Sequence, residues 1–347
     1  MLTNRAATLP GIFLVLLTSC SSPKEAVMDE LFHSYSGLRV PGAAVLVISD
    51  GKPVLERSYG MANLEEEKKV TPQTNFRLAS VTKQFTAMSI MMLVERGALG
   101  VDDTLRHIFP SLPEYANDIT IRHLLQHTSG LVNYEDLIPD TAEVQVLDHD
   151  ILAMMEAMDS TYFDPGTTYR YSNTGYAILA MVVEKVSGEP FASFLRDNIF
   201  VPLGMDNSVA FRDGLNAVPN RAYGYTVTEN EVAFTDQSIT SAVLGDGGVY
   251  SSITDLYKWD QALYTDTLVQ AEAIERMFTP YLESYGFGWR IDEVDGHRRI
   301  HHTGSTSGFR NVIQRFPDDR LTVIILTNRR DPDVAPLADR LAALYLR

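Results

Sequence analysis

The sequence predicts an α+β fold: one antiparallel sheet built from both ends of the chain, with flanking helices, plus an inserted, mostly helical lobe. Two observations support this. Strand-like runs bounded by Gly, Pro and Asp occur near both termini, whereas the long segment between them has mostly helical periodicity. This order is typical of a sheet that both termini complete. We expect one domain over 25–347, with residues 25–79 and 270–347 in its α/β part and residues 80–269 in the helical lobe.

The first residues have the pattern of an export signal. Arg5 precedes a short apolar run, and small residues follow it before Cys20, the only cysteine of the chain. This pattern predicts a signal peptide over 1–19. Residues 17–20, Leu-Thr-Ser-Cys, resemble the lipobox of bacterial lipoproteins, in which the cysteine is lipidated. The resemblance implies a lipidated tether over 20–24 and an extracytoplasmic, membrane-anchored protein on the periplasmic side or the cell surface. The alternative is an ordinary signal peptide followed by an incidental cysteine.

Composition limits the classes of function. The 347 residues are 45% hydrophobic, which is ample for a packed core, and 45 acidic against 29 basic residues give a net charge of −16. Since no run of Lys or Arg exceeds two residues, nucleic acid is not an expected partner. Beyond the signal, no apolar stretch reaches the roughly 18 residues that a membrane-spanning helix needs.

The N-terminal part begins with a predicted helix over 24–36. Two strand-like runs follow, joined at Asp50-Gly51, which is a strong hairpin signal. The charged patch at 65–69 is expected to be a solvated loop. The next helix is expected to start at Ser80, a residue type that caps helix N-termini. It carries apolar residues at helical spacing: Val81, Phe85, Met88 and Met92.

The rest of the lobe contains three more helix signals. One runs from Thr120 to Gly130, one spans 171–188 and is closed by Gly188, and one spans 251–263. The last opens with Ser252 and Asp255 in a capping-box arrangement. Strands then return at 285–292, 298–305, 309–319 and 320–328, and a helix over 332–346 ends the chain.

Ser80 and Lys83 lie three residues apart, so their side chains share one face of a helix. A serine hydroxyl becomes a nucleophile when a base removes its proton. A lysine held beside it and partly desolvated can be that base, because burial lowers a lysine pKa. The alternative is a helix cap followed by a lysine that reaches out to solvent.

Two further motifs support the catalytic interpretation. Tyr171 and Asn173 stand one residue apart in a loop that enters a helix, and His302-Thr303-Gly304 ends a strand. Together with Ser-x-x-Lys, they resemble the three motifs of serine β-lactamases and penicillin-binding proteins. The Tyr-x-Asn form of the second motif resembles that of one branch of the family. This branch contains class C β-lactamases, DD-carboxypeptidases, esterases and D-amino-peptide hydrolases. The resemblance covers residues 25–345 and implies a β-lactamase-like fold.

This resemblance implies a role for each residue. Ser80 is the expected acylated nucleophile, Lys83 its partner and Tyr171 the shared acid/base, with Asn173 orienting Lys83 or the substrate amide. The backbone N–H groups of Ser80 and Ser305 form the expected oxyanion hole. The strand that lines the cleft carries the remaining residues: His302, Thr303 and Gly304.

Two proton arrangements remain open. Ionising Tyr171 at neutral pH costs about 4 kcal/mol, since tyrosine has a pKa near 10. One ammonium at about 4 Å offers a similar free energy at an effective dielectric near 20. A phenolate base therefore requires a charged Lys83, whereas a neutral Lys83 is itself the base. The two groups titrate as a pair.

His302 stands where class C β-lactamases have a lysine followed by Thr-Gly. Because histidine is mostly neutral at pH 7, it offers a hydrogen bond but little attraction for a carboxylate. We therefore expect weaker β-lactam hydrolysis and a closer likeness to the DD-carboxypeptidase branch. Arg290, on the preceding strand, either supplies the missing positive charge or is an edge-strand arginine in solvent.

Other chemical signals are weaker. His123 and His127 have zinc-like spacing, but the glutamate of His-Glu-x-x-His is absent and no metal is expected. His301 alternates to the strand face opposite that of the His-Thr-Gly histidine. Residues 304–308 mimic a Gly-x-Ser-x-Gly elbow but lack its central serine. Residues 245–248, Gly-Asp-Gly-Gly, are expected to form a turn.

The expected protein is a serine hydrolase that forms an acyl-enzyme on an amide or ester of a small molecule or peptide. A D-amino-acid peptide, cleaved in the manner of a DD-carboxypeptidase or D-aminopeptidase, is the first expected substrate and a carboxylic ester the second; no cofactor is expected. A non-catalytic penicillin-binding sensor on the same scaffold is the alternative. Specificity is expected to lie in loops 130–150 and 205–245, where Tyr134 either lines the cleft or packs in the core.

Overall fold

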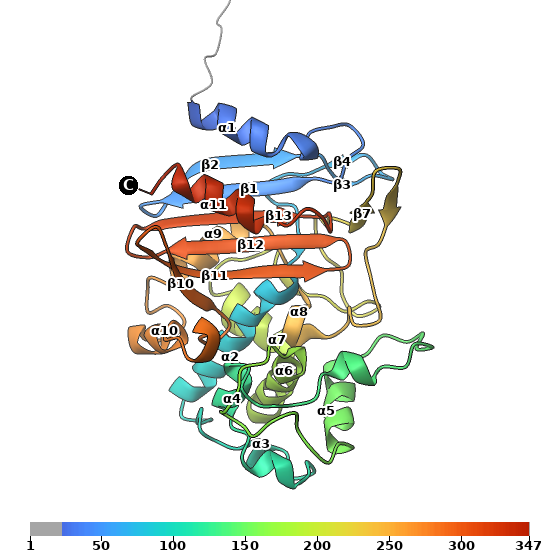
Figure 1. Cartoon of the computed structure of the whole chain (residues 1–347), viewed down its shortest axis with the longest axis vertical. Coiled ribbons are helices and arrows are strands. Elements are labelled where there is room, and N and C mark those ends of the chain that lie inside the picture. The colour runs from blue at the N-terminus through green and yellow to red at the C-terminus, as the bar shows by residue number, and fades with distance from the viewer. Residues whose placement is uncertain (1–22, 347) are drawn as a thin grey trace, which may run out of the picture.

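The computed structural model describes residues 23–346 (Figure 1). The predicted signal peptide and the lipidation site, Cys20, lie outside the described residues. One half of the molecule is a sheet with helices on its faces, and the other half is a helical lobe. No helix within residues 23–346 is both long enough and apolar enough to span a bilayer.

A six-stranded antiparallel sheet forms the first half. Its strands are, in spatial order, β10 (Arg290–Val294), β11 (His297–Thr306), β12 (Phe309–Phe316), β13 (Leu321–Thr327), β1 (Ala43–Ser49) and β2 (Lys52–Tyr59). The pairing of β1 with β13 places Ala43 opposite Thr327, so the two ends of the chain meet inside the sheet as predicted. Asp50 and Gly51 have φ values of 49° and 72°, the left-handed backbone that a two-residue hairpin favours.

Both faces of this sheet are covered. Val45 and Val47 belong to a core that also contains residues of α1 (Pro23–Leu31) and α11 (Ala335–Ala343). The intervening residues of β1 belong to the main core, which continues into the lobe. Burial on both faces explains why β1 is a continuous apolar run instead of an alternating one. Figure 1 shows α11 lying across one face of the sheet.

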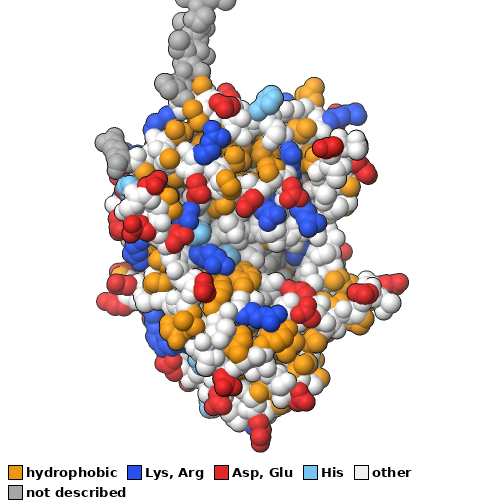
Figure 2. Space-filling view, viewed as in Figure 1, with side chains coloured by type: hydrophobic (Ala, Val, Ile, Leu, Met, Phe, Trp, Pro, Cys, Tyr) orange, Lys and Arg blue, Asp and Glu red, His pale blue; other side chains and the backbone are white. Residues whose placement is uncertain are grey.

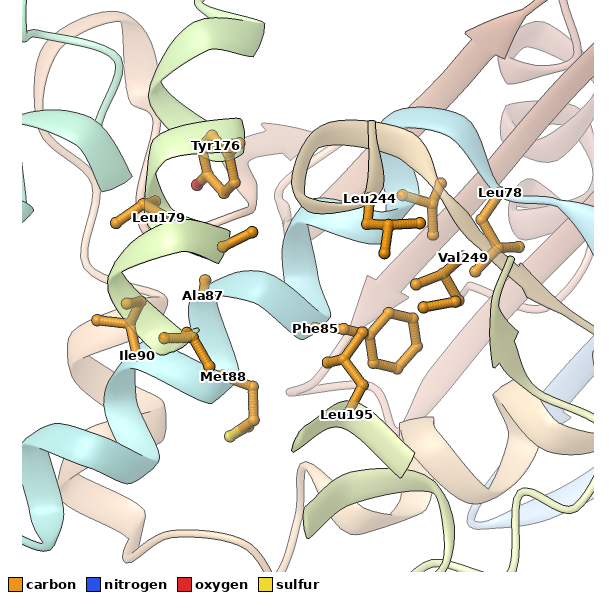
Figure 3. Close-up of a cluster of buried hydrophobic side chains, with 14 of the residues drawn as sticks. Leu78, Phe85, Ala87, Met88, Ile90, Tyr176, Leu179, Leu195, Leu244 and Val249 are labelled. Atoms are coloured by element: carbon orange, nitrogen blue, oxygen red, sulfur yellow. The ribbon is translucent and has the colours of Figure 1, made fainter. Parts of the chain in front are cut away.

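The lobe is built around α2 (Lys83–Glu95) and α6 (Asn173–Ser187). Met88 and Ile90 of α2 lie beside Leu179 of α6 in the main core (Figure 3). This packing brings the first residue of each helix, one in the Ser-x-x-Lys motif and one in the Tyr-x-Asn motif, to the same end of the pair. The fold thus joins two motifs that are about ninety residues apart.

The remaining elements are short. The helices are α3 (Leu105–Ile108), α4 (Ile121–Leu125), α5 (Asp148–Glu156), α7 (Phe191–Leu195), α8 (Leu244–Gly247), α9 (Ile253–Ala262) and α10 (Ala271–Met277). The strands are β3 (Met61–Asn63), β4 (Lys68–Lys69), β5 (Phe76–Arg77), β6 (Val209–Ala210), β7 (Tyr225–Val227), β8 (Val232–Phe234) and β9 (Val249–Ser251). The single turn α8 is the predicted Gly-Asp-Gly-Gly turn.

Several elements are shorter than predicted. Helix α4 ends at Leu125 because His127 adopts a left-handed φ of 58°, so the chain leaves the helix before the expected Gly130. The last helix starts only at Ala335, near a proline that favours a first turn. Helix α1 stops at Leu31 and a 3-10 turn follows it. Strand β10 starts at Arg290, after a glycine with φ 78°.

Two local predictions hold in part. Residues 65–67 form an exposed turn, but the two lysines after them extend into the short strand β4. Ser252 caps α9 by accepting a bond from the Asp255 N–H at 3.2 Å. The Asp255 carboxylate does not return that bond, because it accepts from Asn207 N and Ser208 Oγ. Only half of the capping box forms.

Candidate active site

Ser80 lies in a tight turn instead of capping a helix. The turn is a 3-10 helix over Ala79–Thr82, α2 begins only at Lys83, and no side chain caps either start. The predicted capping role of Ser80 is therefore wrong; its hydroxyl is bonded by a side chain instead. Ala79 has φ 51°, a left-handed conformation that costs a residue other than glycine roughly 1–2 kcal/mol. Backbone strain of this kind clusters at functional sites.

The Lys83 side chain is fully buried, with 0% of its surface exposed. Its Nζ lies 3.2 Å from Ser80 Oγ, 2.8 Å from Asn173 Oδ1 and 2.9 Å from the Asp246 carbonyl oxygen. An amide oxygen and a carbonyl oxygen only accept, so Nζ donates to both in either protonation state. The bond to Ser80 can run in either direction, because a hydroxyl donates as well as accepts. A neutral Lys83 would thus receive the serine proton along this bond.

Asn173, the first residue of α6, is held in one orientation. Its Nδ2 donates to Glu135 Oε1 at 2.6 Å, and this bond to an acceptor fixes the amide with its oxygen toward Lys83. The preceding residue, Ser172, caps the helix by accepting from Gly175 N at 3.1 Å. Asn173 therefore holds its amide oxygen against Lys83, and the orienting role that the resemblance implied stays a prediction.

Tyr171 lies in the loop before α6 and places its ring near Lys83. The distance from Lys83 Nζ to the ring centroid is 4.9 Å, within range of a cation–π contact. Its hydroxyl oxygen is buried and has no hydrogen-bond partner among residues 23–346. The structure thus brings the tyrosine ring to the lysine, and the predicted acid/base role of the hydroxyl stays a prediction.

His302 lies on β11 as expected, but its ring is buried behind the cleft. Nδ1 is 2.7 Å from the Thr303 carbonyl, which only accepts, so Nδ1 carries the proton and Nε2 accepts from the Tyr285 hydroxyl at 2.9 Å. Burial, reinforced by the positive charge of Lys83, holds the pKa of His302 well below its usual value. The ring is neutral, as the sequence predicted, and both nitrogens are already bonded within the protein.

Gly304 allows β11 to approach the 3-10 turn over Ala79–Thr82, called the nucleophile turn below because it carries Ser80. A Cβ at this position would lie 2.1 Å from the Leu78 carbonyl oxygen and 3.3 Å from Ala79 Cβ. Strand β10 pairs only with the first half of β11, up to His301, so the second half has an edge free to face this turn. Ser305, the next residue, is exposed and lines a pocket together with Ser80. These positions suit the expected oxyanion hole, which stays a prediction.

Arg290 is not free in solvent, and its predicted supply of positive charge stays a prediction. Its Nη2 donates to the Tyr169 hydroxyl at 3.2 Å, and its guanidinium lies 5.5 Å from the Tyr285 ring centroid. It is half-buried, so it is not a free arginine in solvent, and it does not line the pocket beside Ser80. Thr303 does not line that pocket either; its carbonyl holds His302.

A pocket of about 110 Å³ lies beside Ser80, and Asn173 and Ser305 also line it. Figure 2 shows the molecule hollowed near its middle, between the sheet and the helices, with acidic and basic side chains interspersed around the hollow. Five polar residues that line the pocket were not predicted from the sequence: Arg77, Glu135, Thr240, Asp246 and Thr306. Glu135 and Thr240 come from the two loops that were expected to set specificity, whereas the other three carried no spacing signal.

The Asp246 carbonyl oxygen accepts a hydrogen bond from Lys83, and the Asp246 side chain is a buried carboxyl group beside it. Its Oδ2 accepts from the Tyr134 hydroxyl at 3.0 Å, and burial raises its pKa to about 6 against the lowering effect of Lys83. Tyr134 is 1% exposed and lines the pocket, so both interpretations of this residue apply. The carboxyl stays close to Lys83 without bonding its Nζ, which contacts the carbonyl instead.

Asp148 holds the turn that carries this carbonyl. Its carboxylate accepts from Leu244 N at 2.8 Å and Gly245 N at 3.0 Å, and burial raises its pKa to about 7 despite these bonds. The folded state thus keeps a proton that the unfolded state loses near pH 4. Its contribution to stability is present below about pH 4 and is lost as the pH rises to about 7, at up to about 1.4 kcal/mol per pH unit.

Comparison of wild type with Asp148→Asn tests this assignment. We expect the free energy of unfolding of wild type to fall relative to the variant between about pH 4 and pH 7, because the amide that replaces the carboxyl group has no proton to lose in this range. Urea unfolding at four pH values across that window measures the difference. A constant difference would contradict the raised pKa of Asp148.

The two histidines of α4 and its following loop make separate contacts. His123 Nδ1 accepts from Thr120 N at 3.2 Å within a capping box, and His127 is buried among aromatic rings. Among the described residues, no three His, Cys, Asp or Glu side chains gather in a way that could hold a metal ion. His301 bonds Asp292 on the face of β11 opposite His302, as strand alternation predicted.

Comparison with known proteins identifies the family. The profile of the Beta-lactamase family matches residues 28–347, nearly the whole chain. The chain therefore belongs to the beta-lactamase family, and its fold and enzyme class, a serine hydrolase, are those that the three motifs predicted.

Individual relatives span several named activities. The chain is 32% identical to penicillin-binding protein 4* of Bacillus subtilis over 329 residues, which is 89% of this chain and 72% of that protein. It is 27% identical to a D-aminopeptidase of Brucella ovis, over 88% of this chain and 59% of that protein. The octameric penicillin-binding protein homologue from Pyrococcus abyssi has a similar structure, with a TM-score of 0.80 and 28% identity, over 92% of this chain and 76% of that one.

Proposed function

We propose that the protein forms an acyl-enzyme through Ser80 and hydrolyses the amide of a D-amino-acid-containing peptide, with carboxylic esters as a second substrate class. The observation that carries this proposal is the fully buried Lys83, whose Nζ lies 3.2 Å from Ser80 Oγ and is oriented by two obligate acceptors. A buried amine aimed at a strained serine turn fits activation of a nucleophile.

The chemistry follows from these contacts. In its neutral form, Lys83 takes the Ser80 proton while Oγ bonds the substrate carbonyl carbon, and the backbone N–H groups of Ser80 and Ser305 stabilise the oxyanion, typically by about 3 kcal/mol per donor. The C–N or C–O bond then breaks, and the proton passes to the leaving amine or alcohol. Water hydrolyses the acyl-enzyme and restores Ser80. Tyr171, with its ring over Lys83, is the proposed second proton carrier.

Two observations favour D-peptides and esters over β-lactams. Relatives over most of the chain include a D-aminopeptidase and penicillin-binding proteins. In addition, His302 is neutral. It offers no positive charge to a β-lactam carboxylate, which supports weaker β-lactamase activity.

The test is a substrate panel run with wild type and Ser80→Ala. It contains D-alanyl peptides with a free N-terminus or a free C-terminus, the matching L-peptides, p-nitrophenyl acetate and nitrocefin. We expect wild type to turn over a D-peptide or the ester and Ser80→Ala to turn over none. Stable labelling by a fluorescent penicillin without turnover of any substrate would favour the non-catalytic sensor. Equal activity of both proteins would exclude the serine mechanism.

We further propose that Cys20 is lipidated and anchors the protein outside the cytoplasm. The lipobox-like residues 17–20 and the position of the only cysteine support this. Cys20→Ala should move the protein from the membrane fraction to the soluble fraction of the host cell, because the acyl chains would be absent. Immunoblots of both fractions measure this shift. An unchanged distribution, or an unshifted mass of the mature wild-type N-terminus, would contradict the anchor.

A further inference from the structure

The loop that carries Tyr171 is tied on both sides to one buried residue, His127. The N–H of Arg170 donates to the His127 carbonyl oxygen at 2.9 Å, and the N–H of Ser172 donates to His127 Nδ1 at 3.1 Å. His127 is 1% exposed. A single residue thus bonds the N–H groups of the two residues on either side of the tyrosine.

The backbone conformation of His127 makes this double contact possible. Its φ of 58° turns the chain out of α4 and presents the carbonyl and the side chain to the same loop. Because an N–H only donates, the bond from Ser172 requires Nδ1 to be unprotonated. Burial and the nearby charge of Lys83 keep the pKa of His127 well below its usual value, so the acceptor is present at neutral pH.

The ring of His127 also packs against the ring of Tyr171. Its centroid lies 4.3 Å from that of Tyr171 and 4.4 Å from that of Tyr285, whose hydroxyl bonds His302. A shift of His127 would therefore move Tyr171 directly and Asn173, two residues further on, through the same loop. His127 touches neither Ser80 nor Lys83 through any hydrogen bond described for residues 23–346.

We propose that His127 is a positioning residue for acylation: its Nδ1 and carbonyl clamp the loop so that Tyr171 and Asn173 face Lys83. This inference rests on the proposed function, because it assigns a part in the Ser80 reaction. It gives the histidine of the His-Thr-Ser-Gly segment a purpose beyond ending α4. It also explains why a histidine occupies a left-handed position that glycine would fill more easily.

Two substitutions separate the acceptor from the ring. His127→Asn removes the ring but keeps an acceptor the same number of bonds from the backbone, and asparagine tolerates a positive φ. His127→Gly also suits the backbone but has no acceptor. His123→Ala is the matched control, because His123 makes the same kind of bond to Thr120 N, and no hydrogen bond described for residues 23–346 joins its side chain to residues 168–175. Each protein is assayed for acylation by p-nitrophenyl acetate and for amide exchange in peptides that cover 168–175.

We expect His127→Gly to lower the saturating acylation rate about 100-fold, the scale of a displacement of about 1 Å, with a saturation constant within about 3-fold of wild type. The same variant should speed exchange at 170–174. His127→Asn should restore both readouts to within about 10-fold of wild type, and His123→Ala should change neither. An Asn variant as slow as the Gly variant, or wild-type exchange in the Gly variant, would overturn the proposal.

Failure of the proposed function gives a different pattern. If wild type reacts with no acylating reagent but exchange at 170–174 still depends on His127 as expected, the clamp stands and the serine hydrolase proposal falls. If neither variant folds, exchange in wild type alone decides: the amides of Arg170 and Ser172 should exchange at least about 10³-fold more slowly than in an unfolded chain. Fast exchange at both would contradict the clamp.

Discussion

Replacing Lys83 by methionine is expected to lower the rate of Ser80 acylation by about 10²–10⁴-fold, the range that a positioned general base contributes. Methionine has a similar length and suits a fully buried position, but it can neither take the serine proton nor donate to Asn173 and Asp246. Stopped-flow measurement of acylation by a chromogenic ester gives the rate, and thermal unfolding shows that the variant is folded.

Lys185→Met is the control for this substitution. Lys185 lies in the last turn of α6, is exposed, and has no contact with the pocket, so its loss should leave the rate within about 2-fold of wild type. A Lys83→Met protein that keeps its fold and acylates within about 10-fold of wild type would contradict the assignment of Lys83 as the base. Tyr171 would then be the group that takes the proton.

Gly304→Ala is expected to reduce acylation by about 100-fold, although it adds only one methyl group. The new Cβ would lie 2.1 Å from the Leu78 carbonyl oxygen, a backbone atom that cannot turn aside. Strand β11 must therefore move away from the nucleophile turn, and the Ser305 N–H moves with it. The acylation rate, measured with the same ester, should fall more than the saturation constant rises.

Gly175→Ala is the matched control, because Gly175 lies in α6 and a Cβ there would meet nothing closer than 3.5 Å. This variant should keep wild-type acylation and gain up to about 1 kcal/mol of stability, as alanine replaces glycine in a helix. Wild-type acylation by Gly304→Ala would show that the close approach of β11 is not needed for the reaction.

The parts of the fold that sequence predicts well are those fixed by local patterns. Asp50-Gly51 predicts a hairpin by itself. The continuous apolar runs of β1 and β13 predict strands that are buried on both faces of a sheet. The Ser-x-x-Lys, Tyr-x-Asn and His-Thr-Gly motifs were found because each is local. Their convergence followed only from the resemblance, since it depends on the packing of α2 on α6 and on the approach of β11 to Leu78 and Ala79, across long stretches of chain.

What the sequence did not show depends on non-local backbone and on side-chain direction. Two groups around Lys83 illustrate this: its partner, the Asp246 carbonyl, has no residue-type signature, and Glu135 bonds Asn173 instead of Lys83 itself. Ser80 looked like a helix cap because serine is favoured both at helix N-termini and in tight turns. His302 was expected at the cleft, but strand alternation does not reveal that Tyr285 would already bond it.

The most direct test of the central claim is peptide mass spectrometry of the protein quenched during reaction with a penicillin. We predict an acyl adduct on the peptide that contains Ser80, absent in Ser80→Ala and slow to form in Lys83→Met. An adduct on any other residue would contradict the account. So would the absence of any adduct while the penicillin is being consumed.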